Sequence, residues 1–359
     1  MSALLDHLRR RIAHEGPLTI AQYMETCLAH PEHGYYMTRD PFGVAGDFTT
    51  APEISQMFGE LIGLWAAQVW QSMGKPENLK WIELGPGRGT LSADAHRAMV
   101  GVPGLSDCLE MHLVETSPVL RERQSATLSN CRPVWHDTLT TIPAGPCVFI
   151  ANEFFDALPV RQLVRAGTGW RERTVAMSET GAMEFSQSPM LGIDPLLPRG
   201  LKSVTDGDVV EISPASIGIV RAMADWLRSE GGAALVVDYG HSTSAPGDTL
   251  QAVKNHAYHD VLDAPGEADL TAHVDFAELA STAMQAGADV HGPVTQGAFL
   301  KDLGIEIRAA QLCDQAAPDQ QAAIKTALAR LTAPDAMGRL FKVMAITAPG
   351  LPQLAGFEA

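Results

Sequence analysis

Short apolar runs that each end in a polar residue recur through the first half of the chain. Flanked by turn residues and by stretches of helical periodicity, such runs are typical of buried strands in a parallel sheet. Open parallel sheets bind ligands at the carboxyl ends of their strands, so the polar residues that end these runs should lie together. The four runs are Lys80–Leu84, His112–Glu115, Pro133–Asp137 and Cys147–Ala151.

Later runs extend this pattern and interrupt it. Gly232–Asp238 predicts a fifth main strand, and Leu340–Ile346 predicts an antiparallel edge strand because it lies close to the end of the chain. Residues 241–271 have no regular pattern and predict irregular structure. Three short runs predict a β-meander that is inserted into the parallel sheet and covers one of its edges. They are Arg161–Ala166, Gly169–Ser178 and Ala182–Gln187.

Helical patterns complete an α/β fold class. Thr19 and Gln22 have the spacing of a capping box at the start of a helix. Pro52 suits the first turn of a long helix that ends near Gly74. We therefore expect a helical N-terminal segment at residues 1–75, a core at 76–348 with insertions at about 160–207 and 241–287, and a tail at 349–359.

A glycine-rich turn follows the first strand of the sheet. Gly85, Gly87 and Gly89 fall at two-residue steps, whereas dinucleotide-binding turns place the third glycine three residues after the second. Glu83 adds a negative charge at the strand end. S-adenosylmethionine, whose ammonium and sulfonium are cationic and which has no pyrophosphate, suits this arrangement. The alternative is that the glycines serve only the backbone geometry of a tight turn.

Two further acids strengthen the cofactor hypothesis. Glu115 ends the second strand, 26 residues beyond Gly89, where it could accept hydrogen bonds from both hydroxyls of a ribose. Asp137 ends the third strand and is placed to meet an adenine amino group. With the polar groups gathered at one edge of the sheet, a cofactor site is favoured over coincidence.

The fourth strand opens into the run Asn152-Glu153-Phe154-Phe155-Asp156, which carries the candidate chemistry. Glu153 and Asp156 stand three residues apart and would project to one side if a helical turn begins there. Two carboxylates can grip the planar guanidinium of an arginine and direct one nitrogen at a methyl group. Phe154 and Phe155 could form an apolar wall. Alternatively, the acids cap a short helix and the phenylalanines belong to the core.

Residues near the fifth strand provide weaker candidates for substrate binding. Asp238 and Tyr239 end that strand, and His273 is a possible proton acceptor or substrate contact. His256 and His259 form an H-x-x-H pattern on an expected loop, which has no established metal geometry. We interpret these two as solvated histidines and predict no metal site.

Composition narrows the class of protein. A net charge of −16 argues against binding to nucleic acid, and no apolar stretch is long enough to cross a bilayer. Five scattered cysteines without a C-x-x-C pair are expected to be reduced thiols. Met1–Glu15 contains two acids and no apolar core, so we expect a cytoplasmic protein without a targeting segment. The sequence gives no oligomeric state.

Longer motifs support a resemblance to a known family over almost the whole chain. Two of them, Asn152–Val160 and Asp269–Phe276, are far more specific than the glycine turn. The other segments are Gly46–Ser55, Phe58–Glu60, Glu83–Leu91, Asp238–Gly240, Asp248–Ala252, Thr295–Gly297 and Gly338–Met344. On these motifs the chain resembles the MidA-like class I methyltransferases, whose eukaryotic mitochondrial members assist assembly of respiratory complex I.

The resemblance implies a Rossmann-like core with a seven-stranded, mostly parallel sheet and S-adenosylmethionine as cofactor. By position, Gly46–Ser55 would form a lid that brings Thr50 to the cofactor. The glycine turn and Glu83 would hold its amino-acid part, Glu115 its ribose and Asp137 its adenine. The turn after the fourth strand, with Asn152, Glu153 and Asp156, would face the methyl group and its acceptor.

The same resemblance implies protein arginine methylation, with symmetric dimethylation of a complex I core subunit in the mitochondrial members. The expected partner is therefore a protein that bears an arginine. Two alternatives remain open: an assembly chaperone that binds the cofactor without transfer, and a methyltransferase for a small molecule or another protein side chain. An NAD-dependent enzyme is the weakest hypothesis because the glycines follow two-residue steps.

Overall fold

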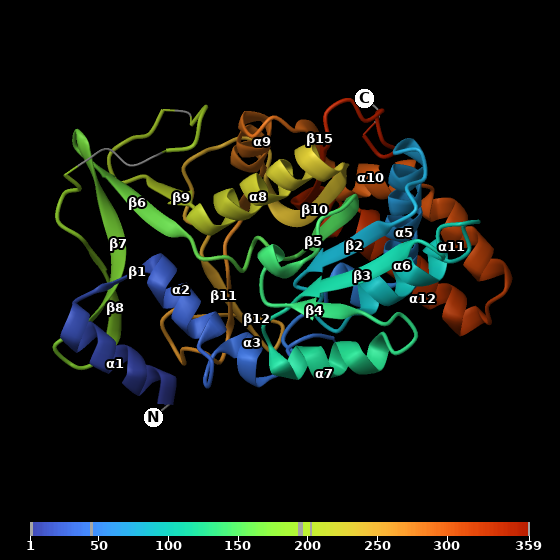
Figure 1. The fold of residues 1–359 in the computed structure, drawn as a ribbon. Coiled ribbons are helices and arrows are strands. Elements are labelled where there is room, and N and C mark those ends of the chain that lie inside the picture. Colours follow the sequence, from blue (N-terminus) through green and yellow to red (C-terminus); the bar gives the residue numbers. More distant parts are fainter. Residues whose placement is uncertain (1–2, 44–45, 193–196, 202, 358–359) are drawn as a thin grey trace.

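The computed structural model describes residues 3–43, 46–192, 197–201 and 203–357. A central sheet has the strand order β15-β16-β10-β5-β2-β3-β4, with the short strand β14 (Val274–Asp275) beside β10 (Figure 1). Its parallel strands are β2 (Leu79–Leu84), β3 (Leu109–Val114), β4 (Val134–His136), β5 (Cys147–Asn152) and β10 (Gly232–His241). Two antiparallel strands, β15 (Asp289–Thr295) and β16 (Phe341–Thr347), complete it. The predicted α/β fold with a seven-stranded, mostly parallel path is confirmed.

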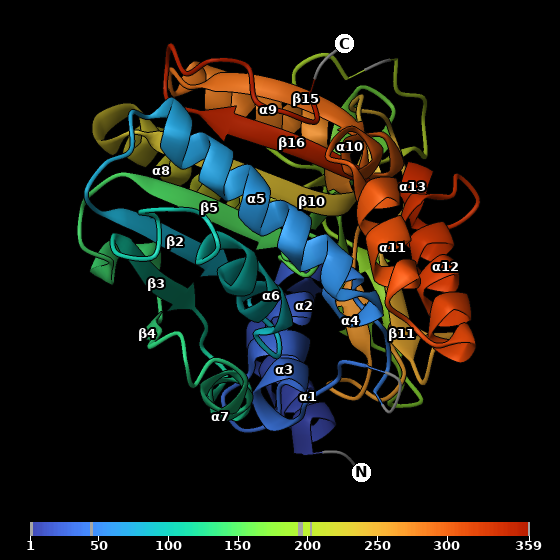
Figure 2. The same ribbon diagram turned by 90° about the vertical axis from the view of Figure 1, so that its right-hand side faces the viewer.

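Helices cover both faces of this sheet (Figure 2). All six residues of β2 and of β5 are buried, and alternate side chains along each strand enter different hydrophobic clusters. One face packs against α5 (Gln56–Ser72) and α6 (Thr90–Met99), and the other against α8 (Pro214–Glu230) and α9 (Phe276–Gln285). Helices α10 (Gln296–Asp302), α11 (Ile305–Asp314), α12 (Pro318–Thr332) and α13 (Met337–Leu340) extend the first layer.

A second sheet contains the predicted meander, but not at the predicted place. Its strands are β1 (Leu18–Thr19), β6 (Arg161–Ala166), β7 (Gly169–Met177), β8 (Met183–Gln187) and β9 (Val209–Ile212). Leu18 pairs with Val175, and both join a buried cluster with α1 (Ala3–Glu15) and α2 (Ile20–Ala29). The meander therefore packs with the N-terminal helices beyond the strand ends and covers no edge of the central sheet (Figure 1).

A third, small sheet corrects the expectation of irregular structure at 241–271. It has the order β12-β11-β13, formed by β11 (Gln251–Lys254), β12 (Ala257–His259) and β13 (Asp269–Thr271). Strands of three or four residues are too short to show an alternating pattern in the sequence. Only their mutual pairing makes them recognisable.

Two other expectations are wrong in detail. The final strand β16 is not an edge strand, because β15 pairs with its outer side. The helix expected from Pro52 is broken: α4 (Ala51–Ile54) ends before Ser55, whose φ of −163° is extended and whose side chain accepts a hydrogen bond from the Met57 N–H at the start of α5. The capping box of Thr19 and Gln22 is confirmed at the start of α2.

The division into an N-terminal segment, core, insertions and tail stays a prediction. Residues 193–196 and 202 of the expected first insertion, and 358–359 of the tail, lie outside the described residues. The remaining short helices are α3 (Tyr35–Thr38), which lies within the expected loop, α7 (Pro118–Thr127), and a 3-10 turn at Leu139–Thr141.

Candidate active site

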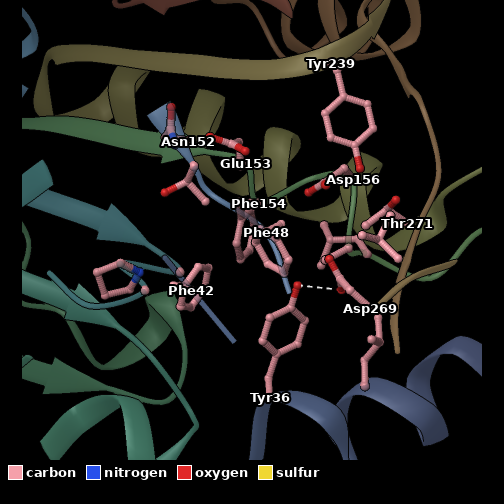
Figure 3. Close-up of a pocket in the computed structure, with 18 of the residues that line it drawn as sticks. Tyr36, Phe42, Phe48, Asn152, Glu153, Phe154, Asp156, Tyr239, Asp269 and Thr271 are labelled. Atoms are coloured by element: carbon pink, nitrogen blue, oxygen red, sulfur yellow. Dashed lines mark hydrogen bonds between the residues drawn. The ribbon is translucent and has the colours of Figure 1, made fainter. Parts of the chain in front are cut away.

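A cavity of about 860 Å³ lies at the carboxyl ends of the parallel strands. Its walls come from the glycine turn, the strand ends, the N-terminal segment and the small third sheet (Figure 3). The structure thus brings together most of the residues that the sequence singled out. Those that line the cavity are Thr50, Glu83, Gly85, Gly87, Glu115, Asn152, Glu153, Phe154, Asp156, Tyr239 and His273.

The glycine turn packs too closely against neighbouring aromatic rings to admit a side chain. Gly85 has a φ of +61°, and an added Cβ would lie 2.8 Å from the Phe154 ring. Gly87 has a φ of +55°, and its Cβ would lie 3.3 Å from the Phe42 ring. Both positions therefore need glycine for the backbone conformation and for the close approach of neighbouring groups. The backbone of the turn therefore lines the cavity as a cradle, with the Phe154 and Phe42 rings packed against it.

Two buried carboxyls stand beside this cradle. Burial raises the pKa of Glu83 to about 7, although Ser92 donates a hydrogen bond to it. Burial also raises the pKa of Glu115, which accepts hydrogen bonds from the Ser117 N–H at 2.7 Å and from Gln124 at 3.1 Å. Gln124 donates in addition to the Gly87 carbonyl at 2.8 Å, so it joins Glu115 to the glycine turn. The arrangement fits a ligand with cationic and hydroxyl groups.

The turn after β5 does not form the expected helical turn. Glu153 has a φ of +50°, a left-handed conformation that is unfavourable for a residue with a Cβ. Its Oε1 accepts hydrogen bonds from the Ala51 N–H at 2.8 Å and from the Asn152 amide at 3.3 Å. Burial, followed by the nearby Asp156, raises the pKa of Glu153 to about 7. Strain and a perturbed carboxyl at a cavity wall are typical of functional sites.

Comparison with known proteins decides the class. A family model described as "Putative S-adenosyl-L-methionine-dependent methyltransferase" matches residues 61–294. The chain belongs to this family. Its cofactor is S-adenosylmethionine, and its enzyme class is methyltransferase.

Relatives of this methyltransferase are similar over nearly their full length. The Xenopus laevis protein named "Protein arginine methyltransferase NDUFAF7, mitochondrial" is 37% identical over 99% of this chain and 89% of its own. The Homo sapiens protein of the same name is 36% identical over 96% and 83%. A Burkholderia thailandensis "likely methyl transferase", solved with S-adenosyl-homocysteine, has a TM-score of 0.84 at 30% identity, covering 99% of this chain and 94% of that one. The predicted family, cofactor and reaction class are confirmed.

Four predicted site residues do not line the methyltransferase cavity. Gly89 has a φ of +81° at the start of α6, and its added Cβ would meet Leu128 instead, so its place in the turn is explained by geometry. The Asp137 side chain is 77% exposed and pairs with Arg121. Phe155 is buried in the core on the α8 side of the sheet, as the alternative interpretation expected.

Asp238, the fourth of these residues, supports the site from beneath. It is fully buried, and its Oδ2 accepts hydrogen bonds from the backbone N–H groups of Phe154, Phe155 and Asp156 at 3.0 to 3.2 Å. Asp238 therefore fixes the turn that carries Glu153, and the predicted contact with substrate is not supported by its position. The neighbouring Tyr239 does line the cavity.

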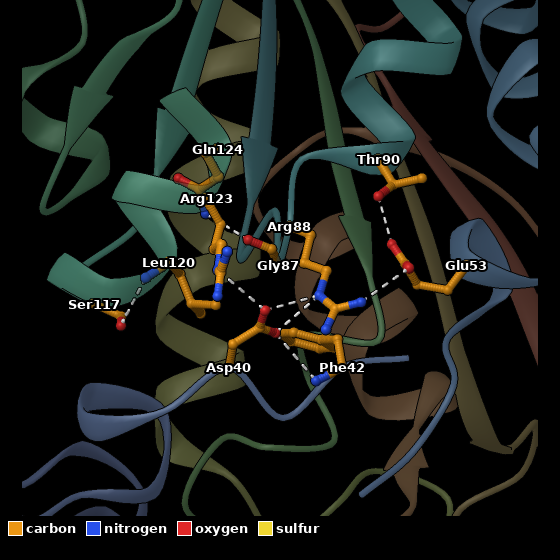
Figure 4. Close-up of polar contacts among 10 residues, drawn as sticks. All are labelled: Asp40, Phe42, Glu53, Gly87, Arg88, Thr90, Ser117, Leu120, Arg123 and Gln124. Carbon is orange, nitrogen blue, oxygen red and sulfur yellow. Dashed lines mark hydrogen bonds and ion pairs between the residues drawn. The ribbon is translucent and has the colours of Figure 1, made fainter. Parts of the chain in front are cut away.

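The N-terminal segment, both before and within the expected lid Gly46–Ser55, is tied to the glycine turn through Arg88 (Figure 4). The Arg88 Nε lies 2.9 Å from both carboxylate oxygens of Asp40, and its Nη1 lies 3.5 Å from Glu53. Glu53 also accepts a hydrogen bond from Thr90, at the start of α6. Phe42, which precedes the expected lid, and Thr50, which lies within it, line the cavity. The sequence analysis missed Arg88 and Asp40, because ion pairs between distant segments leave no local pattern.

Two further residues that the sequence did not single out, Tyr36 and Asp269, line the cavity. Asp269 accepts a hydrogen bond from the Tyr36 hydroxyl at 2.7 Å (Figure 3). The ring of the predicted residue His273 lies 5.6 Å from that of Tyr239, and burial lowers the pKa of His273. Asp269 opens the specific motif Asp269–Phe276, which was the only available signal.

Within the described residues, no helix has the length and hydropathy needed to cross a membrane.

Proposed function

We propose that this methyltransferase transfers a methyl group to a guanidinium nitrogen of an arginine in a partner protein. The curated relatives are named protein arginine methyltransferases. The observation that carries the proposal is the Oδ1 atom of Asp156, which is buried without a hydrogen-bond partner and lines the cavity beside Glu153. A buried acceptor of this kind is costly unless a ligand satisfies it.

The charges at this point favour a cationic ligand. Burial raises the pKa of Asp156 to about 6, against the effect of a hydrogen bond from Tyr239. The pKa of Glu153 is raised by burial and then by the proximity of Asp156. A guanidinium between the two carboxyls would reverse both shifts, because a nearby positive charge stabilises the ionised form. It would also supply donors in a planar fork that matches carboxylates.

The proposed mechanism uses the two carboxylates to hold and orient the acceptor. Bound S-adenosylmethionine supplies an electrophilic methyl group on its sulfonium. Glu153 and Asp156 would direct one guanidinium nitrogen towards that methyl; the N–C bond forms as the S–C bond breaks, and S-adenosyl-homocysteine leaves. Glu153 would accept the proton that the nitrogen loses. Phe154, which contacts the glycine turn, would exclude water from the reacting groups.

A transfer assay tests this proposal. Protein extracts from cells that lack this chain would be incubated with the purified enzyme and methyl-labelled S-adenosylmethionine, and labelled residues identified by mass spectrometry. We expect methylarginine with the wild type and none with Glu153→Ala, while calorimetry shows that the variant still binds S-adenosyl-homocysteine. Label on another residue type, or label that persists in Glu153→Ala, would contradict the proposal. Binding without any transfer would favour the assembly-chaperone alternative.

We further propose that the acceptor belongs to respiratory complex I and that this chain acts in the cytoplasm. The family resemblance and the name of the relatives support the first point only. The second point is the expectation from the sequence, and it differs from the location printed for these relatives, which is mitochondrial. Mass spectrometry of purified complex I from cells with and without the chain tests the first point. Fractionation of cells that produce the tagged chain tests the second.

A further inference from the structure

The cavity has an acidic region beyond Glu153, of which the reaction described above uses only Asp156. Asp269, on β13, is 5% exposed, and Thr271, two residues later on the same strand, is 3% exposed. Both line the cavity with Tyr36 of α3 and Asp156 (Figure 3). Residues from the second insertion, the N-terminal segment and the turn after β5 therefore meet at one place.

Two of these buried side chains have oxygen atoms without a partner. The Oγ1 of Thr271 and the Oδ1 of Asp156 are both buried without a partner of good hydrogen-bond geometry among the described residues, although the Tyr239 hydroxyl interacts with both side chains. Asp156 is itself only 6% exposed. A buried, unsatisfied oxygen costs free energy in a native protein, so its presence in a cavity indicates a place for donors of a ligand.

Asp269 is oriented towards this place by the N-terminal segment. The Tyr36 hydroxyl donates to Asp269 at 2.7 Å, while the Tyr36 carbonyl accepts a hydrogen bond from Ser117 at 2.6 Å. Ser117 in turn donates its backbone N–H to Glu115. Tyr36 is thus held between the proposed cofactor carboxyl and Asp269, which fixes the position of its hydroxyl.

The surroundings of Asp269 carry negative charge. Burial, followed by the negative charge of nearby Asp156, raises the pKa of Asp269 to about 8. Asp47 and Glu153 raise this pKa further, whereas the hydrogen bond from Tyr36 lowers it. No lysine or arginine is among the main causes of the shifts of Asp156 and Asp269. A cation entering the cavity would therefore be attracted by a carboxyl whose main charged neighbours are other carboxyls.

We propose that Asp269, oriented by Tyr36, is a further residue of the acceptor site and binds the positive charge of the acceptor side chain together with Asp156. This inference rests on the proposed function, in that the cation is the side chain to be methylated. The inference adds a substrate preference to the proposed function. The carboxylates of Asp156 and Asp269, on different segments, would favour a positively charged side chain over a neutral one of the same shape.

Calorimetry with three small probes tests the inference. Nα-acetyl-arginine methylamide, the corresponding lysine derivative and the neutral citrulline derivative would each be titrated into full-length protein saturated with S-adenosyl-homocysteine. Citrulline matches arginine in shape without its charge. We expect the wild type to bind the arginine probe at least about tenfold more tightly than the citrulline probe. Asp269→Asn should remove this difference while the affinity for S-adenosyl-homocysteine stays unchanged.

Matched variants guard against a merely structural effect. Asp263 lies in the same insertion, and its side chain is 73% exposed. The variant Asp263→Asn should therefore bind all three probes as the wild type does. Tyr36→Phe should lower the affinity for the arginine probe less than Asp269→Asn does. In the Asp269→Asn background it should add no further loss, because Tyr36 acts through Asp269. If Asp269→Asn fails to fold, Tyr36→Phe and Thr271→Val provide the same test with smaller expected losses.

The outcomes separate this inference from the proposed function. Equal affinities of the wild type for the charged and neutral probes, or unchanged discrimination in Asp269→Asn, would overturn the inference. Preference for the lysine probe, lost in Asp269→Asn, would support the charge-binding role of Asp269 while contradicting arginine as the acceptor.

Discussion

Replacing Arg88 with alanine should speed the release of cofactor product from this methyltransferase. Arg88 joins the glycine turn to the N-terminal segment through Asp40 and Glu53, and that segment contributes Phe42 and Thr50 to the cavity wall. Without the guanidinium, Glu53 loses its cation, Asp40 keeps only the more distant Arg123, and the segment is held less firmly over the cavity. Because a bound nucleoside can leave only when its cavity opens, weaker closure should appear mainly in the dissociation rate.

The size of the effect follows from the geometry. A hydrogen bond to a charged group contributes ~1.5–3 kcal/mol, and the Arg88 Nε contacts both oxygens of Asp40 at 2.9 Å. The Asp40 side chain is 12% exposed but that of Arg88 is 31% exposed, so solvent weakens the pair. We therefore take the lower end, ~1.5 kcal/mol, which corresponds to an increase of about tenfold in the dissociation rate.

Stopped-flow measurement of S-adenosyl-homocysteine release gives the rate directly. Arg123→Ala is the matched control, because Arg123 approaches the same Asp40 at 3.5 Å with a side chain 64% exposed. That pair should contribute little, so the control should release the product at nearly the wild-type rate. If Arg88→Ala and Arg123→Ala release it equally fast, the ion pairs of Arg88 do not hold the cavity closed, and the reasoning is refuted.

Three further predictions follow from the carboxyls. Glu115→Gln should lower the affinity for S-adenosylmethionine about tenfold in calorimetry, because a charged hydrogen-bond acceptor is lost. The control Glu122→Gln, at an exposed position of α7, should leave the affinity unchanged. The kcat/KM for transfer, which reports the free enzyme, should rise with pH through about 7 as Glu153, whose pKa is raised to about 7 by burial, becomes charged; a midpoint near its ordinary 4.5 would argue against its role. Glu60→Gln should cost ~2–3 kcal/mol of unfolding free energy in urea, because Glu60 is 7% exposed and accepts from Arg308 at 2.8 Å. Although burial alone raises the pKa of Glu60, its hydrogen bonds lower it overall, so this stabilisation is present above pH 4.5 and should shrink as pH falls below it.

The sequence by itself determined the features that depend on neighbouring residues. Strands β2, β3, β4 and β5 were predictable because apolar runs that end in polar residues mark buried parallel strands. The glycine turn and the capping box of Thr19 and Gln22 were predictable because each is completed within a few residues. The cofactor class followed from the same local logic, with Glu83, Glu115 and the glycines at adjoining strand ends.

Tertiary structure alone decided which of these residues meet. Asp238 and Glu153 are both acids at the end of an apolar run, yet Asp238, within β10, is buried beneath the turn and Glu153, after β5, faces the cavity. Chain packing and not residue type sets this difference. The contact of Tyr36 with Asp269 joins positions 233 residues apart. The contact of Arg88 with Asp40 joins two segments that are separated in the chain by α4, α5 and β2. Such contacts form only when separate elements pack together, so no periodicity or spacing along the chain could reveal them.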